Sequence, residues 1–196
     1  MPQIAALNHV ALLLPSVRQA ASILEKAGLP IGPEEQWDGE GTREIYVGGP
    51  GQGGRLLLMQ PVKEGAYARA MAKRGPGLHH IAIDVPELEE FIRGLSGSGW
   101  YLHPSSLQSI RKTQTAWLAR PGMPTLIEVQ QASPVELVPV LVTRLEMPLP
   151  EFGMRMFAAL GMGALVGATL GGLRIEFGAV RVSLAELLDS AGLPEP

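Results

Sequence analysis

The chain lacks cysteine, and its Lys and Arg residues form no dense cluster. Without cysteine there is no disulfide framework and no thiolate ligand, so any metal ion must be held by histidine, carboxylate or amide groups. The formal net charge is -3, and the 16 Lys and Arg residues are dispersed along the sequence. This dispersion argues against the basic stripe of a nucleic-acid-binding surface, and we expect no nucleic-acid partner.

Signals for export and membrane insertion are absent or weak in this sequence. The first residues, MPQIAALNHV, contain no basic region followed by a long apolar one, so we expect a cytoplasmic location. One uncharged run, 156–173, approaches the length of a membrane span. Its glycines disfavour an isolated helix, and we expect a buried or dimer-interface segment instead.

One sequence module occurs twice along the 196 residues. LNHVALLLPSV (7–17) and LHHIAIDVPEL (78–88) align with an offset of 71 residues, and the alignment continues without a gap. The equivalent positions include Leu7 and Leu78, His9 and His80, Pro15 and Pro86, Gly28 and Gly99, Tyr46 and Trp117, and Pro50 and Pro121. A gapless match over this distance indicates a duplicated structural unit.

Each copy is expected to fold as β-α-β-β-β, which predicts an α+β fold. Hydrophobic periodicity predicts a strand over 6–14 and a helix over 16–27 that begins at Ser16. Further extended segments are expected near 32–38, 42–48 and 54–62. The second copy gives a strand at 78–85, a helix at 87–96, and extended segments near 100–104, 113–120 and 125–131. A short helix at 66–74 is expected to join the copies.

The C-terminal part, 134–196, lies outside the repeat and is interpreted as an extension of unknown role. Residues 173–183 alternate between apolar and polar side chains, which predicts a small hairpin. Ser183 and Glu186 have the spacing of a capping box, which predicts a terminal helix over 184–192. We expect this extension to cover an apolar surface or to mediate association.

Two histidines and one glutamate are candidates for a metal site. His9 and His80 occupy equivalent positions, so a pseudo-twofold axis between the copies would bring their imidazoles together. Glu128 is an isolated carboxylate in an apolar strand, which is costly to bury unless a cation neutralises it. A divalent cation shared by the three side chains would do so, although each histidine taken singly is more typical of a structural role, and Glu128 taken singly is more typical of a solvent-exposed edge strand.

Strand alternation makes further predictions about which side chains share a face. The predicted companions are Leu7, Ala11 and Leu13 for His9, and Leu78, Ala82 and Asp84 for His80. His79 is then expected on the opposite face, in a structural or surface role. His103, which precedes Pro104, is expected in a loop.

Three phrases, LNHVALLLPSV, GPGLHHIAIDVPEL and PTLIEVQ, resemble the vicinal oxygen chelate (glyoxalase/bleomycin resistance/extradiol dioxygenase) superfamily. The phrase GLHHIA and the strand-proline-helix after it most resemble the methylmalonyl-CoA epimerase group. The resemblance covers 4–132 and implies two tandem βαβββ modules, 4–62 and 77–132, that form an open eight-stranded cup around one metal ion. With the extension at 134–196, this gives a predicted domain over 1–133.

The family places its metal ligands on the first and last strands of each module. Carried onto this sequence, the four positions are His9, Leu57, His80 and Glu128. Leucine cannot coordinate a cation, and this departs from the Gln, Glu or His of epimerases and glyoxalases. Gln60 lies nearby, but its place along the strand predicts the opposite face.

The resemblance implies a metal-dependent isomerase, epimerase or glyoxalase-like lyase. Its substrate would be an acyl thioester or hemithioacetal, reacting through an enolate-like intermediate. The ion would be divalent (Zn, Co, Ni, Mn or Fe), the general base Glu40 or Glu44, and the assembly a homodimer. Two alternatives stay open: an Fe(II) extradiol-type dioxygenase with a two-His-one-Glu triad, and a metal-free module that binds a small molecule.

Overall fold

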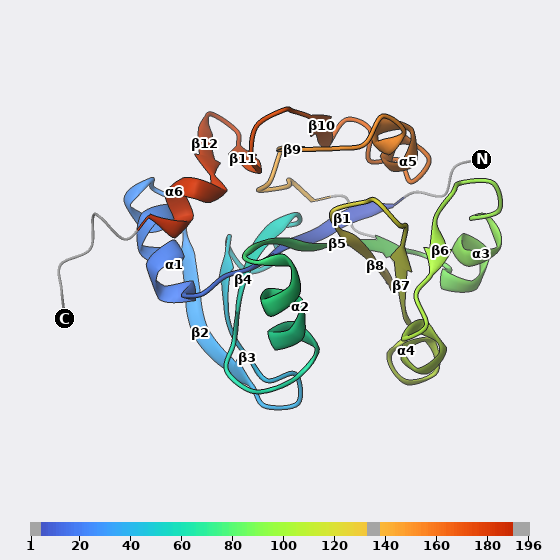
Figure 1. The fold of residues 1–196 in the computed structure, drawn as a ribbon, viewed down its shortest axis with the longest axis horizontal. Helices are drawn as coiled ribbons and strands as arrows, with labels where there is room; N and C mark the ends of the chain where they lie inside the picture. The colour runs from blue at the N-terminus through green and yellow to red at the C-terminus, as the bar shows by residue number, and fades with distance from the viewer. Residues whose placement is uncertain (1–4, 133–137, 190–196) are drawn as a thin grey trace.

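The computed structural model describes residues 5–132 and 138–189, which form two separate β-sheets (Figure 1). The larger sheet has eight strands in the order β2-β3-β4-β1-β5-β8-β7-β6 and curves into an open cup. The smaller sheet has four strands in the order β10-β9-β11-β12. The predicted α+β class is therefore confirmed, with a second sheet formed by the extension.

The elements follow the duplicated order along the chain. The first module comprises β1 (Ala6–Leu13), α1 (Val17–Lys26), β2 (Ile31–Trp37), β3 (Thr42–Val47) and β4 (Arg55–Pro61), and α2 (Ala66–Arg74) follows it. The second comprises β5 (Gly77–Val85), α3 (Leu88–Arg93), β6 (Tyr101–Leu102), α4 (Ser106–Thr113), β7 (Thr115–Ala119) and β8 (Leu126–Gln131). The extension comprises β9 (Arg144–Met147), α5 (Gly153–Ala158), β10 (Val166–Ala168), β11 (Arg174–Phe177), β12 (Val180–Ser183) and α6 (Leu184–Leu188).

The two copies of the sequence repeat are related by a pseudo-twofold axis that passes between β1 and β5. These central strands are antiparallel, and Val10 lies opposite Ile81, its own equivalent 71 residues later. Outside them, β4 pairs in parallel with β1, and β8 pairs in parallel with β5. The axis therefore relates His9 to His80 directly, because both lie one position from it.

The symmetry extends to the bonds that hold the module helices. Gln60 Oε1 accepts a hydrogen bond from the backbone N–H of Val17 at 3.2 Å. Its equivalent, Gln131, accepts one from the backbone N–H of Leu88 at 3.1 Å. In each module the last strand thus satisfies an N–H group at the start of the helix. Gln60 points toward α1, away from the candidate ligand positions, as its strand position predicts.

Two helices agree with the sequence prediction, and two differ from it. Helix α1 begins after Ser16, whose side chain accepts a hydrogen bond from the N–H of Gln19, and α2 spans its predicted range. Helix α3 is shorter than predicted, and α4 lies mostly in a stretch for which no element was predicted. The sequence of α4 carries little apolar periodicity, since Leu107 is 74 % exposed and its buried residue, Ser106, is polar.

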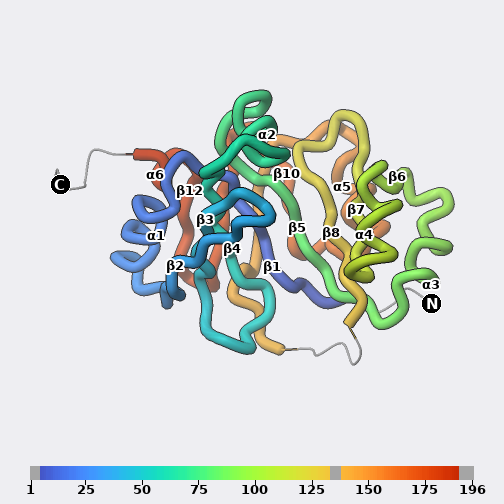
Figure 2. Tube along the Cα trace, turned by 90° about the horizontal axis from the view of Figure 1, so that it is seen from below, coloured from blue at the N-terminus to red at the C-terminus, as the bar shows by residue number. Residues whose placement is uncertain are grey.

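The extension packs on the outer face of the large sheet, between α1 and α3, opposite the open side of the cup (Figures 1 and 2). Its side chains Phe157, Val166 and Ile175 join the core that contains Val10 and Leu12 of β1. The Nε1–H group of Trp100 donates to the carbonyl of Met156 at 2.8 Å, which ties α5 to the second module. The extension therefore completes the core on this face.

The run 156–173 is divided between the end of α5, β10 and the loops beside them, and most of its large apolar side chains join the core of this chain, whereas Leu170 is exposed. No helix in the described ranges is long and apolar enough to cross a membrane. The predicted hairpin and the Ser183–Glu186 capping box are confirmed, whereas β9 was not predicted. The predicted boundary at residue 133 and the predicted helix end at 190–192 lie outside the described residues.

Candidate metal centre

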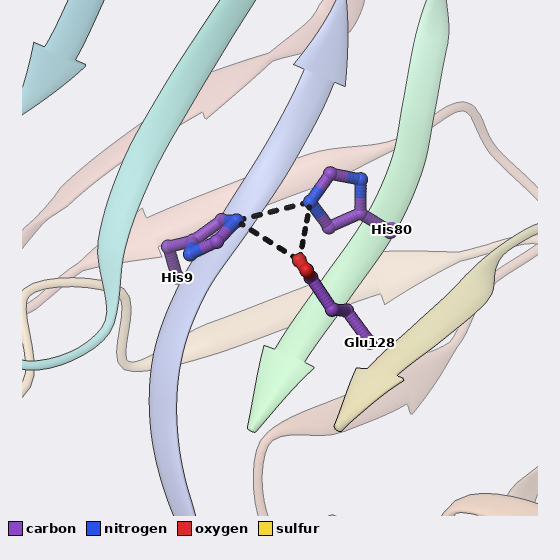
Figure 3. Close-up of side chains that lie close together, drawn as sticks. All are labelled: His9, His80 and Glu128. Carbon is purple, nitrogen blue, oxygen red and sulfur yellow. Dashed lines mark hydrogen bonds and ion pairs between the residues drawn. The ribbon is translucent and has the colours of Figure 1, made fainter. Parts of the chain in front are cut away.

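His9 of β1, His80 of β5 and Glu128 of β8 converge on the inner face of the cup (Figure 3). The two Nε2 atoms are 3.0 Å apart. Glu128 Oε2 lies 3.4 Å from Nε2 of His80 and 3.8 Å from Nε2 of His9. All three side chains are largely buried. Three strands that are distant in sequence therefore aim one ligand atom each at a common point.

Two of these separations, 3.0 and 3.4 Å, match regular coordination of a single metal ion, and the third, 3.8 Å, requires a wider angle at the ion or a small closure of the site. Two donors at about 2.1 Å from one ion lie about 3.0 Å apart at a right angle and about 3.4 Å apart at the tetrahedral angle. Burial, and secondarily the charge of Arg55, lowers the pKa of His9 to about 4, and burial lowers the pKa of His80 well below its usual value. The imidazoles are therefore neutral near pH 7, which is the form that binds a metal.

Glu128 provides the negative charge of this group. Burial raises the pKa of Glu128 to about 7 in the metal-free protein. Its ion-pair partners among the described residues are the two imidazoles, which are neutral, and neither an Arg nor a Lys side chain of those residues lies within ion-pair distance to compensate the charge of the carboxylate. A divalent cation would supply that compensation, and the two-nitrogen, one-oxygen set suits borderline metals.

An aromatic ring packs against each candidate imidazole. Tyr46 of β3 contacts His9 edge to face at 5.9 Å between ring centroids. Trp117 of β7 contacts His80 in the same way at 5.1 Å. Tyr46 and Trp117 are equivalent positions in the repeat. In each module, an aromatic side chain from the strand two places away in the sheet thus restricts the orientation of the imidazole.

The predicted place of His79 is wrong. A register shift between β1 and β5 falls at this residue, and its ring turns toward the same side as that of His80. His79 Nδ1 lies 2.9 Å from His80 Nδ1, and the ring packs against Tyr67 of α2 at 5.0 Å. The prediction failed because strict alternation does not hold through a β-bulge.

The same β-bulges place two residues on the face opposite to the predicted one. Leu7 and Leu78 pack against the large core on the outer side of the sheet, rather than beside His9 and His80. Ala11 and Leu13 do share the inner face, in a small apolar cluster. His103 lies in the loop before α4, where its Nδ1 bonds with Ser105 Oγ, as predicted for a loop residue.

The fourth ligand position of the family is apolar here. Leu57 is buried in a cluster with Ala11, Leu13 and Met59. Side chains of α2, including Tyr67 and Met71, pack over this cluster. Helix α2 thus closes the inner face of the first module at the position that corresponds to Glu128 in the second.

The two predicted bases occupy different environments. Glu44 is buried on β3, accepts a hydrogen bond from Thr42 Oγ1 at 2.7 Å, and lines a cavity of about 340 Å³ with Tyr46. Burial raises the pKa of Glu44. Glu40 is exposed in the turn before β3. Burial of Tyr67, together with the negative charge of Glu40, raises the pKa of Tyr67. Only Glu44 is therefore both buried and beside a cavity.

Arg55 is a polar residue of this face that the sequence interpretation missed. It pairs with His9 in the parallel β1–β4 register, and its guanidinium lies over the Tyr46 ring at 3.9 Å from the centroid. It also lines the cavity that contains Glu44. Within the described ranges Arg55 makes no salt bridge, so a partly buried positive charge faces this cavity without an anionic partner.

The comparisons with known proteins agree with this fold. A family model described as glyoxalase/bleomycin resistance protein/dioxygenase superfamily matches residues 8–119. The fold is similar to that of a hypothetical protein from Bacillus halodurans (TM-score 0.55, 23 % identity, covering 67 % of this chain and 97 % of that one). No curated protein sequence matches this chain significantly.

Two solved epimerase structures are also similar to this chain. The methylmalonyl-CoA epimerase from Mycobacterium tuberculosis has a TM-score of 0.50 and 26 % identity, covering 66 % of this chain and 89 % of that one. A methylmalonyl-CoA epimerase in complex with methylmalonyl-CoA and an ammonium ion has a TM-score of 0.51 and 17 % identity, covering 68 % and 98 %. The second likeness concerns the fold alone.

Proposed function

Because the chain belongs to the glyoxalase/bleomycin resistance protein/dioxygenase superfamily, we propose that it is a metal-dependent epimerase or glyoxalase-type isomerase of a small acyl substrate. The observation that carries the proposal is the convergence of the ligand atoms of His9, His80 and Glu128 within 4.8 Å of one another. The similarity to an epimerase at 26 % identity supports this class over other reactions of the superfamily.

In this proposal His9, His80 and Glu128 hold one divalent ion (Zn, Co, Ni, Mn or Fe). The bound ion would act as a Lewis acid toward two neighbouring substrate oxygens and stabilise the negative charge of an enolate-like state. The chain contributes two neutral imidazoles and one carboxylate to that site. Tyr46 and Trp117 pack edge to face against the imidazoles and restrict their orientation.

Glu44 is the stronger candidate for the general base. Its carboxylate would take the proton from the substrate carbon next to the carbonyl, and a raised pKa brings the group closer to the working pH. Thr42 holds Oε1 by a hydrogen bond, which orients the carboxylate on the cavity wall. Return of a proton to the opposite side of that carbon requires a second acid, for which Glu40 is the candidate.

Arg55 favours an anionic substrate. Its guanidinium is fixed over Tyr46 beside His9 and is available to bind a carboxylate or phosphate group. An acyl thioester whose reacting carbon also carries a carboxylate would satisfy both the metal site and this charge. A neutral hemithioacetal would leave Arg55 without a partner.

Proton exchange at the reacting carbon tests the proposal. The protein, loaded with each divalent metal in turn, would be incubated in deuterium oxide with carboxylated and neutral acyl thioesters and with a hemithioacetal, and exchange followed by proton NMR. We expect exchange of the carboxylated thioester, and a loss of at least about 100-fold in Glu44→Gln. Metal binding without exchange of any of these substrates would overturn the proposal.

A second candidate is Fe(II)-dependent ring cleavage by an extradiol-type dioxygenase. The observation in its favour is that Leu57 leaves two imidazoles and one carboxylate, which is the ligand set of non-haem Fe(II) oxygenases. Oxygen consumption by the Fe(II)-loaded protein with a panel of catechols would distinguish it. Failure to bind any divalent ion would instead favour a metal-free binding module.

The proposal includes a cytoplasmic homodimer. Sedimentation of the purified chain without detergent would test the assembly, and a single monomeric species at micromolar concentration would contradict it. Fluorescence microscopy of a tagged full chain would test the location.

A further inference from the structure

The two central strands each carry one extra residue. On β1, Leu7 pairs with Ile83 and His9 with Ala82, so Asn8 has no opposite residue on β5. On β5, the partners of Ala11 and Leu12 are His80 and Leu78, so His79 has no opposite residue on β1. Asn8 and His79 are equivalent in the repeat, since they lie 71 residues apart. The β-bulge is therefore duplicated together with the ligand histidine that follows it.

Each bulge turns its extra side chain toward the next imidazole. Asn8 Oδ1 lies 2.8 Å from His9 Nδ1, and His79 Nδ1 lies 2.9 Å from His80 Nδ1. In a regular strand, consecutive side chains point to opposite faces and could not meet in this way. The residue types differ, but both contacts reach Nδ1, the ring nitrogen that does not face Glu128.

The Asn8 contact determines which nitrogen of His9 carries the proton. The Nδ2 group of Asn8 donates to both carboxylate oxygens of Asp84, at 3.0 and 2.9 Å. Its Oδ1 atom therefore faces His9 as an acceptor, and His9 Nδ1 must donate. A neutral imidazole with its proton on Nδ1 has a free lone pair on Nε2, which is the tautomer that can bind a metal through Nε2.

The His79 contact can do the same for His80. His79 is buried and its ring is held against Tyr67, so its orientation is fixed from the side of α2. When His80 Nδ1 donates to the lone pair of His79 Nδ1, the proton of neutral His79 resides on its own Nε2. The lone pair of His80 Nε2 is then free on the side of His9 and Glu128.

We propose that Asn8 and His79 are positioning residues that fix the tautomer and the ring orientation of His9 and His80 for metal binding. This inference rests on the proposed function only in that His9 and His80 are taken as the metal ligands. Partners of this kind on the distal nitrogen of a ligand histidine commonly change metal affinity by about 10- to 100-fold. Here a duplicated backbone irregularity supplies both of them.

Exchanging the two residue types tests the inference most sharply. Asn8→Leu and His79→Leu remove the polar contacts, whereas Asn8→His and His79→Asn give each module the partner that the other module uses. We expect the dissociation constant for Zn²⁺, measured by competition with a chelator, to rise about 10- to 100-fold in each leucine variant and to stay within a few-fold in each exchanged variant. Gln60→Leu is the control, because it removes a polar contact on the outer face of the sheet.

A second measurement does not depend on metal or activity. Long-range ¹⁵N–¹H NMR of the metal-free full chain distinguishes Nδ1–H from Nε2–H imidazoles. We expect the Nδ1–H tautomer for His9 in the natural sequence and a mixture in Asn8→Leu. In the metal-free chain the 3.0 Å contact between the two Nε2 atoms needs one proton, which His80 carries until a metal replaces it. An Nε2–H tautomer for His9 in the unsubstituted protein would overturn the inference, even if a leucine variant failed to fold.

The outcomes separate this inference from the proposed function. If the unsubstituted protein binds no divalent ion, the metal site itself fails. If it binds Zn²⁺ and the leucine variants, folded by circular dichroism, bind it equally well, then Asn8 and His79 have only a structural role and the inference fails. The combination of weaker binding in the leucine variants and preserved binding in the exchanged variants supports it.

Discussion

The first and second modules contribute the same backbone framework to the inner face of the cup, but different chemical groups. Each supplies a histidine, a bulge residue that contacts its Nδ1, and an aromatic ring at its edge. On the last strand, however, the first module has Leu57 where the second has Glu128. The symmetry of the fold thus places equivalent Cα positions around the site, while the identity of each residue decides which of them can act as a ligand.

The unequal position is also covered differently. Leu57 packs with Met59 beneath α2, whereas Glu128 contacts the two histidines. An apolar cluster therefore occupies one side of the site, and the negative charge is concentrated on the other. This difference explains why the site has three candidate ligands rather than four. It can be removed by changing Glu128 in the second module or Leu57 in the first.

The largest effect is expected from removing the ligand that only the second module has. Glu128→Ala should raise the dissociation constant for a divalent metal by more than about 100-fold, because a direct ligand contributes more than a residue behind it. Isothermal titration with Zn²⁺ and Co²⁺ would measure this. The matched control is Glu89→Ala, which removes an exposed carboxylate from α3. Equal affinities of the two variants would contradict the assignment of Glu128.

The next effect is expected from making the two modules alike. Leu57→Gln places a donor at the fourth position, and we expect metal affinity to rise about tenfold. The metal-free variant should lose about 1–3 kcal/mol of unfolding free energy, because an unpaired amide enters an apolar cluster. Chemical unfolding with and without Zn²⁺ would measure both quantities.

Met59→Gln is the control for this change, since Met59 is buried in the same cluster on the same strand. It should lose comparable stability without any gain in metal affinity. If both variants bind metal as the natural chain does, position 57 does not face the site.

The pH dependence of metal binding should follow the second module's carboxylate. Burial raises the pKa of Glu128 to about 7, so a proton competes with the metal below pH 7 and not above it. Affinity should fall about tenfold per pH unit between pH 7 and 5 and stay nearly constant from pH 7.5 to 9. His9, with a pKa lowered to about 4, should add no proton competition in that window. Affinity that is independent of pH from 5 to 7 would show that Glu128 is not protonated there.

The smallest effect should be equal in the two modules. Gln60→Ala and Gln131→Ala each remove one hydrogen bond to the start of a helix, and each should lower the unfolding free energy by about 1 kcal/mol. Metal affinity should not change in either variant. Urea unfolding would test whether the two equivalent hydrogen bonds contribute equally to the unfolding free energy. A loss of stability in only one of the two variants would argue against equal contributions.

The duplicated pattern was enough to predict eight strands in two equivalent modules and the meeting of His9 with His80, while the open cup was predicted from the resemblance to the superfamily. It sufficed because a gapless offset fixes which residues are equivalent, and a pseudo-twofold axis then brings equivalent residues on neighbouring strands together. The Ser16 cap and the capping box at Ser183 were predictable because both are local patterns.

Other features depend on contacts that a local pattern does not contain. The place of His79 depends on a bulge, and no residue type in GLHHIA indicates where alternation fails. Helix α4 is held by Ser106, which exchanges hydrogen bonds with the backbone of Trp117, and not by an apolar stripe. The position of 156–173 against the outer face is a long-range packing result, and so is the contact of α2 with Leu57.

Anomalous diffraction from crystals of the zinc-loaded protein tests the central claim most directly. The account predicts one strong peak, measured at the zinc absorption edge, within about 2.3 Å of Nε2 of His9, Nε2 of His80 and a carboxylate oxygen of Glu128. Crystals of Glu128→Ala should show a weak peak or none at that position. A zinc-loaded crystal with its peak elsewhere, and with the three side chains in contact with one another as in the metal-free protein, would contradict the account.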